Sequence, residues 1–436
     1  RFQQLYRMGQ TPYTVPQNIC RQEEKGMRFN TSLLHAGVQK ETNGSTLPPV
    51  YQTSAFEQTS ASDLEKIFEN KAPGFCYTRV GNPTIMAFEN RITKLEGGIA
   101  SIACASGMAA LMNAFLNILR SGDEIVSSAS LYGGTIDLFR DLEAFGITTR
   151  YVENNNWEQI EAAINEHTRL IFAETIGNPC LDVTDIETLA ELAHSHGLPL
   201  IVDNTTATPY LIQVLKHGAD IVVNSSSKYI NGSSNSISGI LTDGGKFKWD
   251  KEKYPGLADY VRFGPMAFIA KLRNGLFRNT GACLSPVNAY LNVIGLETLG
   301  LRMERQCNNA FELAGWIEDN YPDVTVNYPG LKSSRWHDIA ERELTNGYGA
   351  ILTLRVGSKE QAFEFIDSLK LAYTLSNIGD TKTLVIHPGS TISLHSTDEQ
   401  KEDAGVFEDL IRVSVGIEDI QDIKEDFAQA FAKIGK

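Results

Sequence analysis

The chain has 436 residues, of which 39 are Lys or Arg and 53 are Asp or Glu, so its formal net charge at pH 7 is −14. Apolar residues make up 42% and charged residues 21%, which allows a large buried core and argues against extended disorder. The acidic balance disfavours nucleic acid or an anionic membrane as a partner, and no stretch approaches the roughly 20 apolar residues of a membrane-spanning helix. We therefore expect a soluble, cytoplasmic protein with no nucleic-acid or membrane partner.

The first 26 residues differ in pattern from the rest of the chain. Gln, Pro and Asn are scattered through them without periodicity, and they precede Met27. This pattern predicts a disordered leader or an appended extension.

From residue 86 a regular alternation of helical and strand-like segments begins. A helical stretch ends in glycines, and an apolar run then leads into a second helix that opens with SGMAA. Further along, short β-rich runs alternate with amphipathic stretches; the runs are DEIVSSAS, TTRYVEN, RLIFAETIGNP, LPLIVDNT and ADIVVNSSSK. Strands and helices alternating in this way predict a mostly parallel sheet with helices on both faces, over residues 86–285.

After residue 285 the pattern changes. A long helical stretch is followed by mixed strand and helix patterns: AILTLRVG, KEQAFEFIDSLK, LIRVSVGIE and DIKEDFAQAFAKIG. We expect a smaller α+β domain over residues 286–436.

Polar side chains follow three of the predicted parallel strands. Ligands of open α/β sheets bind beyond the carboxyl ends of the strands. The residues at these ends are Glu174 and Asn178, then Asp203 and Thr205, then Ser225, Ser227 and Lys228. The sequence therefore predicts a carboxylate and an amine at one edge of the sheet.

A carboxylate and an amine so placed suit pyridoxal phosphate (PLP). That cofactor needs an amine for its aldehyde, a carboxylate for its ring nitrogen and donors for its phosphate. Lys228 and Asp203 can supply the first two. The phosphate donors could be Ser225 and Ser227, together with the backbone N–H groups of Gly107 and Met108 where SGMAA opens a helix. Taken singly, an Asp after a strand is often only a helix cap and a Lys is usually solvated, so spacing alone leaves the cofactor open.

Metal ligands are not expected. The six cysteines are far apart without a C-x-x-C pair, and His194 and His196, two residues apart, do not share one face of a helix.

Eight ordered motifs connect the chain to a known family. They are PPVYQTSAF, YTRVGNPT, SGMAA, LYGGT, E-T-x-x-N-P, VDNT, S-x-S-K and IRVSVGIED. From about residue 27 to its end, the chain resembles the Cys/Met-metabolism family of PLP-dependent enzymes. The resemblance implies PLP as cofactor and fold type I, the aspartate-aminotransferase-like fold.

Within that family, the chain is most similar to the O-acetylhomoserine sulfhydrylases (homocysteine synthases). The similar stretches are DGGKFKW, AFIAKLR, LSPVNAYL, GLETLGLR and SNIGDTKTLVIHPGST. The similarity implies a methionine-biosynthetic transferase that performs γ-replacement on O-acetyl-L-homoserine with sulfide or a thiol. The alternatives are a methionine or cystathionine γ-lyase, an O-succinylhomoserine sulfhydrylase, or a non-catalytic scaffold that keeps the fold.

The resemblance also implies a role for each matching residue. Lys228 would join the cofactor's aldehyde and then move protons, Asp203 would pair with the ring nitrogen, and Tyr132 would stack on the ring and shuttle a proton. The expected cofactor-binding set is Lys228, Asp203, Tyr77, Arg79, Gly107, Met108, Tyr132, Asn178, Thr205, Ser225 and Ser227. The expected substrate-binding set is Arg412, Ser376, Asn178 and Tyr77.

The subunit arrangement is implied in the same way. Tyr77 and Arg79, in an N-terminal arm over residues 27–85, would reach the phosphate in a neighbouring subunit. This implies a homo-oligomer, a tetramer built from dimers that share active sites.

Three departures from the family pattern bear on this interpretation. The turn before the lysine reads Ser-Ser-Ser-Lys where Ser-x-Thr-Lys is more usual, but Ser227 keeps a hydroxyl. INGSSNSISG lacks a histidine common in the family, and Ser393 stands where relatives of the suspected type often have His. The last two place substrate choice in question rather than cofactor use.

Overall fold

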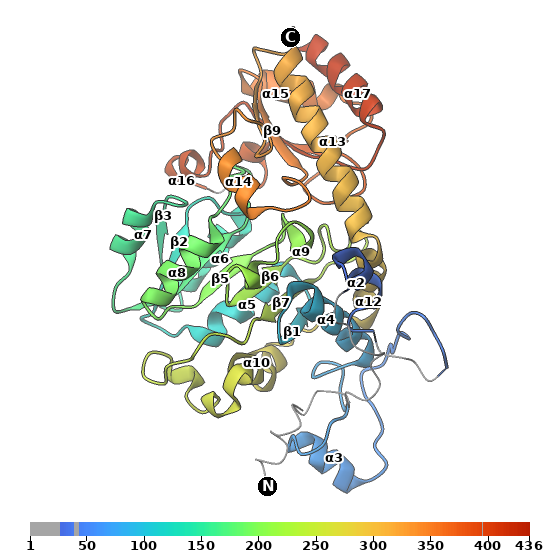
Figure 1. Ribbon diagram of the computed structural model, residues 1–436, viewed down its shortest axis with the longest axis vertical. Helices are drawn as coiled ribbons and strands as arrows, with labels where there is room; N and C mark the ends of the chain where they lie inside the picture. Colours follow the sequence, from blue (N-terminus) through green and yellow to red (C-terminus); the bar gives the residue numbers. More distant parts are fainter. Residues whose placement is uncertain (1–26, 39–42, 395) are drawn as a thin grey trace.

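The computed structural model describes residues 27–38, 43–394 and 396–436, so the leader expected over residues 1–26 lies outside the described residues. The described part contains a large sheet and a smaller one, with the long helix α13 (Leu299–Asn320) running from one unit into the other (Figure 1). No helix in this part is both long and apolar enough to cross a membrane.

The large sheet has seven strands in the order β1-β7-β6-β5-β4-β2-β3. They are β1 (Ala100–Cys104), β2 (Glu124–Ser128), β3 (Thr148–Val152), β4 (Thr168–Glu174), β5 (Leu200–Asp203), β6 (Ile221–Asn224) and β7 (Gly239–Asp243). Strands β2 to β6 are parallel, and β7 is antiparallel to both β1 and β6. The mostly parallel sheet predicted from the sequence is confirmed, with β7 as the one reversed strand.

Helices cover both faces of this sheet, as β4 shows. Leu170 and Phe172 pack with apolar residues of α5, α6 and α10, whereas Ile171 and Ala173, which point to the opposite face, pack with residues of α4, α8 and α12. The helices of this unit are α4 (Pro83–Glu96), α5 (Gly107–Ile118), α6 (Gly133–Glu143), α7 (Trp157–Ala163), α8 (Ile186–Ser195), α9 (Thr208–Leu211), α10 (Ala267–Asn274), α11 (Leu276–Thr280) and α12 (Pro286–Glu297). Three 3-10 segments accompany them: η2 (Val214–Lys216), η3 (Pro255–Leu257) and η4 (Val261–Met266).

The smaller unit is built on a five-stranded sheet in the order β10-β11-β12-β9-β8, in which β10 and β11 are parallel and the other pairs antiparallel. Its strands are β8 (Thr325–Asn327), β9 (Ile351–Arg355), β10 (Tyr373–Thr374), β11 (Leu384–Ile386) and β12 (Leu410–Ser414). Its helices are α14 (His337–Glu343), α15 (Lys359–Ser368), α16 (Asp398–Asp403) and α17 (Ile420–Lys433), with the 3-10 turn η5 (Pro388–Ser390). The α+β character expected for this part of the chain is confirmed.

Helix α13 contributes side chains to a hydrophobic core of the large unit and to that of the small unit. Met303, in its first half, packs with α4 and α12 in the core of the large unit, whereas Leu313 and Ile317 pack with α15 and α17 in the core of the small one. A single long helix therefore carries side chains of both units. The domain boundaries expected at residues 85/86 and 285/286 stay predictions.

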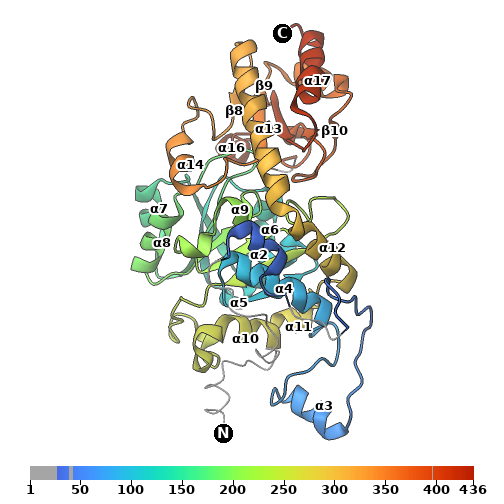
Figure 2. The same cartoon turned by 45° about the vertical axis from the view of Figure 1, so that its right-hand side comes forward.

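The N-terminal segment has one packed helix and one projecting helix. Leu33 of α2 (Phe29–His35) is buried in the core that contains α4 and α12. By contrast, α3 (Ala61–Phe68) has no buried residue of its own and lies away from the body of the molecule in both views (Figures 1 and 2).

Candidate functional site

The carboxyl ends of β4, β5 and β6 bring the predicted polar residues to one edge of the large sheet. Glu174 and Asp203 are the last residues of β4 and β5 and lie opposite each other in register. Lys228 follows four residues after the end of β6. Because β1 is antiparallel to β7 and β7 to β6, β1 ends at the same edge, and the N-terminus of α5 lies there too.

Gly107, the first residue of α5, lies directly against Ser225. A Cβ atom at position 107 would come within 2.7 Å of the Ser225 Cβ and 2.8 Å of its Oγ. The missing side chain therefore keeps the backbone N–H groups at the start of α5 open beside a hydroxyl, which suits a bound phosphate. Met108, also expected to bind phosphate, is the second residue of the same helix.

The loop after β6 is fixed by two hydroxyl groups. The backbone N–H of Ser225 donates to Oγ1 of Thr205 at 2.7 Å. The Ser227 hydroxyl donates to the carbonyl of Ser238 at 2.9 Å and accepts from its N–H at 2.9 Å. In this structure Ser227 and Thr205 thus hold the loop, and Ser225 is the serine that faces Gly107.

Asp203 is a partly buried carboxylate held by the turn that follows it. Its Oδ1 accepts from the backbone N–H of Thr205 at 2.9 Å. Burial raises its pKa to about 6, against the opposing effect of the Thr205 hydrogen bonds. A protonated pyridine nitrogen beside this carboxylate would offset the cost of burying it.

Glu174 holds the backbone at Tyr132. Its Oε1 accepts from the Tyr132 N–H at 2.7 Å, and burial together with the neighbouring Asp203 raises its pKa well above the usual value. Tyr132 immediately precedes α6, and its side chain is 41% exposed. A Cβ at Gly134 would come within 2.5 Å of that ring, so the ring's position depends on this glycine.

The side chain of Lys228 is held by the small domain. Its Nζ donates to Oδ1 of Asn377 at 2.6 Å. Burial, and secondly the charge of Arg412, lower its pKa to about 8. A larger fraction of the amine is therefore neutral near physiological pH than for an exposed lysine, as a nucleophile toward an aldehyde requires.

Arg412 is a guanidinium only 3% exposed on β12. Its Nη1 donates to Oδ1 of Asn178 at 3.1 Å and its Nη2 to the carbonyl of Asn377 at 3.1 Å. Its Nε is buried without a hydrogen-bond partner among the described residues, and burial lowers its pKa to about 10. A buried cation bonded to neutral oxygens, with one N–H unused, is suited to a carboxylate ligand.

Among the described residues, the side chains of Tyr77, Arg79 and Ser376 form no hydrogen bond with Lys228 or Arg412. Arg79 lies 5.5 Å from the centre of the Tyr77 ring and donates to the carbonyl of Arg278 at 2.5 Å; both Tyr77 and Arg79 are exposed. Ser376 is exposed too, and its neighbour Asn377 takes the position between Lys228 and Arg412. Sequence reasoning missed Asn377, although it lies in the SNIGD stretch that carries part of the resemblance.

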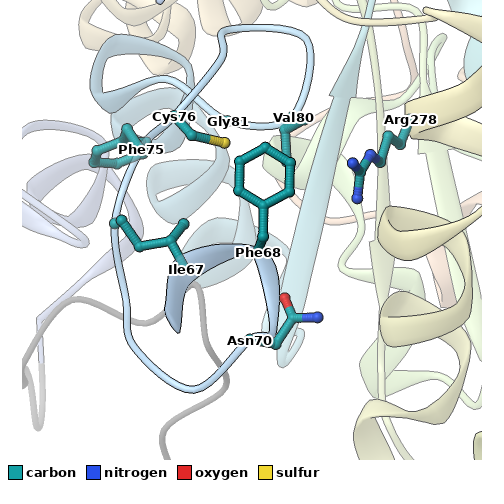
Figure 3. Close-up of a pocket in the computed structure, with 9 residues that line it drawn as sticks. Ile67, Phe68, Asn70, Phe75, Cys76, Val80, Gly81 and Arg278 are labelled. Atoms are coloured by element: carbon teal, nitrogen blue, oxygen red, sulfur yellow. The ribbon is translucent and has the colours of Figure 1, made fainter. Parts of the chain in front are cut away.

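A separate small pocket lies beside α3. Phe68, Phe75 and Val80 line it, with Arg278 at its edge (Figure 3). Its volume of about 20 Å³ has room for a water molecule but not for a cofactor or an amino acid. The cluster around Lys228, with its amine, carboxylates and buried guanidinium, is the better candidate for chemistry. Within the described residues, no group of three or more His, Cys, Asp or Glu could hold a metal ion.

Comparisons with known protein sequences identify the family to which the chain is related. A family model described as Cys/Met metabolism PLP-dependent enzyme matches residues 30–432. Homocysteine synthase of Schizosaccharomyces pombe is 43% identical, covering 92% of this chain and 97% of its own. O-acetyl-L-homoserine sulfhydrylase of Corynebacterium glutamicum is 42% identical, covering 93% and 97%.

Solved structures show the same architecture. A Campylobacter jejuni structure, assigned as an O-acetylhomoserine (thiol)-lyase and containing N′-pyridoxyl-lysine-5′-monophosphate, has a TM-score of 0.89, 32% identity and coverage of 93% of this chain and 100% of its own. Cystathionine γ-lyase of Lactobacillus plantarum, complexed with L-serine, has a TM-score of 0.82, 32% identity and coverage of 94% and 100%. Fold and site together define a PLP-dependent enzyme of fold type I.

The chain belongs to the Cys/Met metabolism family of PLP-dependent enzymes. The family and the cofactor predicted from the sequence are thereby confirmed. The residues present also fit the cofactor, because Gly107 leaves space against Ser225, Asp203 is a carboxylate at the same edge and Lys228 is an amine with a lowered pKa.

Proposed function

We propose that this enzyme performs γ-replacement on O-acetyl-L-homoserine, with sulfide or a thiol as the incoming group. The ester oxygen leaves Cγ as acetate, sulfur bonds to Cγ, and the product is homocysteine, or methionine when the thiol is methanethiol. The relatives named homocysteine synthase and O-acetyl-L-homoserine sulfhydrylase, at 42–43% identity over more than nine-tenths of the chain, support this substrate. The structural observation that supports an amino-acid substrate is the buried Arg412 guanidinium, whose Nε has no hydrogen-bond partner among the described residues and which is held through Asn377 beside the Lys228 amine.

Each residue of the cluster has a task in this reaction. Arg412, with Asn178, would bind the substrate carboxylate and thereby orient the amino group toward Lys228. Lys228, once its amine is free, would remove the proton from Cα and assist proton transfer at Cβ. When bound, PLP supplies an electron sink for the negative charge that develops at Cα. Asp203 would keep the proton on the ring nitrogen, and Tyr132 would lie over the ring and pass a proton near Cγ.

The phosphate would be bound from two sides. The N–H groups of Gly107 and Met108 and the hydroxyl of Ser225 would hold it from within the chain. Ser227 would join them by turning its hydroxyl away from the Ser238 carbonyl. We propose that Tyr77 and Arg79 serve the site of a neighbouring subunit, because they lie exposed in the N-terminal segment and contact each other and Arg278 rather than Lys228. The active unit would then be a dimer, with a tetramer as the full assembly.

A γ-lyase is the second candidate, because the cystathionine γ-lyase structure shares the fold over 94% of the chain. The substrate is tested by measuring kcat/KM for O-acetyl-L-homoserine and O-succinyl-L-homoserine with sulfide, and for methionine and cystathionine without it. We expect the highest value with the acetyl ester. A higher value for the succinyl ester would correct the leaving group, and efficient release of keto acid from methionine or cystathionine would contradict the proposal.

A further inference from the structure

A buried polar layer lies directly behind the edge of the sheet that carries the site. Thr175, Asn204 and Asn224 are chain neighbours of Glu174, Asp203 and Ser225. Because successive side chains of extended backbone point to opposite faces, they lie on the face away from the site. A fourth residue, Glu96, the last of α4, joins this layer, and none of the four is more than 1% exposed.

The layer contains two hydrogen-bonded side-chain pairs, Glu96 with Asn224 and Thr175 with Asn204. Oε1 of Glu96 accepts from Nδ2 of Asn224 at 2.7 Å. Oδ1 of Asn204 accepts from Oγ1 of Thr175 at 2.8 Å, and Nδ2 of Asn204 donates to the carbonyl of Ile212 at 3.0 Å. The ends of β4, β5 and β6 are thus backed by one polar cluster.

Two acceptor atoms of this cluster have no hydrogen-bond partner among the described residues. They are Oε2 of Glu96 and Oδ1 of Asn224, and both are buried. They belong to the two side chains that already share the bond from Nδ2 to Oε1. Exchanging the oxygen and nitrogen positions of the Asn224 amide would not help, because Oδ1 would then face Oε1 of Glu96, which is also an acceptor.

One proton resolves the mismatch. If Oε2 carries it, the O–H can donate to Oδ1 while Oε1 accepts from Nδ2, and the two side chains form a closed acid–amide pair with both leftover atoms satisfied. Burial raises the pKa of Glu96 to about 8, outweighing the opposing effect of the neighbouring Asn224 and Asn204 side chains. An ionised Glu96 would instead be a fully buried charge among neutral amides.

We propose that Glu96 is protonated in the native enzyme and forms a carboxylic acid–carboxamide pair with Asn224, which positions the loop carrying Ser225 and Lys228. Asn224 is the last residue of β6, so a fixed position of its side chain would also fix the backbone where the loop begins. Glu96 is a positioning residue in this account, and its function rests on the role proposed above for Lys228.

Other titratable groups lie on α4 and on the elements packed against it. Within α4, Glu89 pairs with Arg273 and Arg91 with Glu297 of α12. On β7, burial raises the pKa of Asp243 to about 7, so this group titrates close to the range expected for Glu96. The substitutions at position 96 are therefore compared in both the native and an Asp243→Asn background.

The test uses holoenzyme and two substitutions of similar size. In Glu96→Gln the amide N–H replaces the acid O–H, so we expect PLP retention, the cofactor absorbance and kcat/KM to stay within about twofold of the native enzyme. In Glu96→Met the acid–amide pair is lost. We expect PLP affinity to fall at least roughly tenfold, which is the order of effect expected from losing one buried pair of hydrogen bonds. Native-like PLP binding and absorbance in Glu96→Met would overturn the positioning role.

Protonation is tested separately, without substrate. Because the folded-state pKa is raised, the stability that the proton contributes is lost as pH rises from the ordinary carboxyl value through about 8. The native Tm should therefore fall relative to that of Glu96→Gln over this range. At neutral pH the infrared difference spectrum, native enzyme minus Glu96→Gln in the Asp243→Asn background, should contain the band of a protonated buried carboxyl, because the bands of other buried carboxyls such as Glu174 cancel in the difference. Parallel Tm profiles with no such band would overturn the proposal. The infrared result stands even if Glu96→Met fails to fold, and it is independent of whether the substrate is O-acetylhomoserine.

Discussion

Lys228 and Arg412 share one partner. The Nζ of Lys228 donates to Oδ1 of Asn377 at 2.6 Å, and Nη2 of Arg412 donates to the backbone carbonyl of the same residue at 3.1 Å. Asn377 belongs to the small domain and Lys228 to the loop after β6 of the large one. The proposed proton-transfer amine and the proposed carboxylate site are therefore set relative to each other by a single residue.

This relationship predicts different effects of substitutions at two neighbouring positions. In Asn377→Ala the backbone contact to Arg412 remains but the acceptor for Lys228 is lost, so kcat should fall about tenfold with a smaller change in KM, as expected for one hydrogen bond to a charged group. Ser376→Ala is the matched control, since Ser376 is exposed, and should stay within about twofold. Steady-state kinetics on both variants measure these effects, and a larger loss of activity in Ser376→Ala would support the substrate-binding role predicted for Ser376.

Arg412 should favour substrates that carry an α-carboxylate over analogues that lack it. Arg412→Lys keeps a charge but loses the planar fork, and we expect kcat/KM to fall on the order of 10- to 100-fold, from the loss of charge-assisted hydrogen bonds. The matched measurement uses the decarboxylated amine analogue of the substrate. Native enzyme and Arg412→Lys should have similar kcat/KM values for the analogue. An equal fall in kcat/KM for the substrate and the analogue would argue against carboxylate binding by Arg412.

The lowered pKa of Lys228 predicts how recombination of the cofactor-free protein with PLP depends on pH. The neutral amine is the reactive form, so the rate constant should rise with pH to a midpoint near the pKa of about 8. Arg412 contributes to that lowering, so Arg412→Met should move the midpoint to higher pH. Stopped-flow absorbance gives both profiles, and coincident midpoints would show that Arg412 does not act on Lys228.

PLP binding should require a residue without a side chain at position 107. Gly107→Ala places a Cβ 2.7 Å from the Ser225 Cβ, and we expect PLP affinity to fall at least roughly tenfold while the fold is retained. Gly315→Ala is the control, because Gly315 lies in α13 and a Cβ at this position would meet no other atom within 4 Å among the described residues. It should leave PLP affinity unchanged and stabilise the protein by about 0.5–1 kcal/mol. Equilibrium dialysis with PLP and thermal unfolding separate the two outcomes.

The sequence predicts the parts of the site that local pattern determines. Asp203 and Lys228 follow apolar strands in a βαβ series, and the rule for ligands of such sheets places them at one edge from the order of the strands alone. The reversed direction of β7 has no comparable signal, because SISGILTDG is as compatible with a parallel strand as with an antiparallel one.

Residues brought together by tertiary packing are harder to predict. Asn377 and Ser376 are adjacent and both polar, and only the path of the chain between β10 and β11 decides which one faces Lys228. The pairing of Glu96 with Asn224 joins residues on α4 and β6, and a Glu just before a helix-ending glycine would ordinarily be interpreted as a solvated residue.

Product analysis with and without sulfide shows whether sulfur replaces acetate at Cγ. Purified holoenzyme is given O-acetyl-L-homoserine with and without sulfide, and homocysteine, acetate and keto acid are quantified together. We expect homocysteine and acetate in equal amounts when sulfide is present, and little turnover without it. Keto acid and ammonia released at a similar rate with or without sulfide would contradict it and identify a γ-lyase.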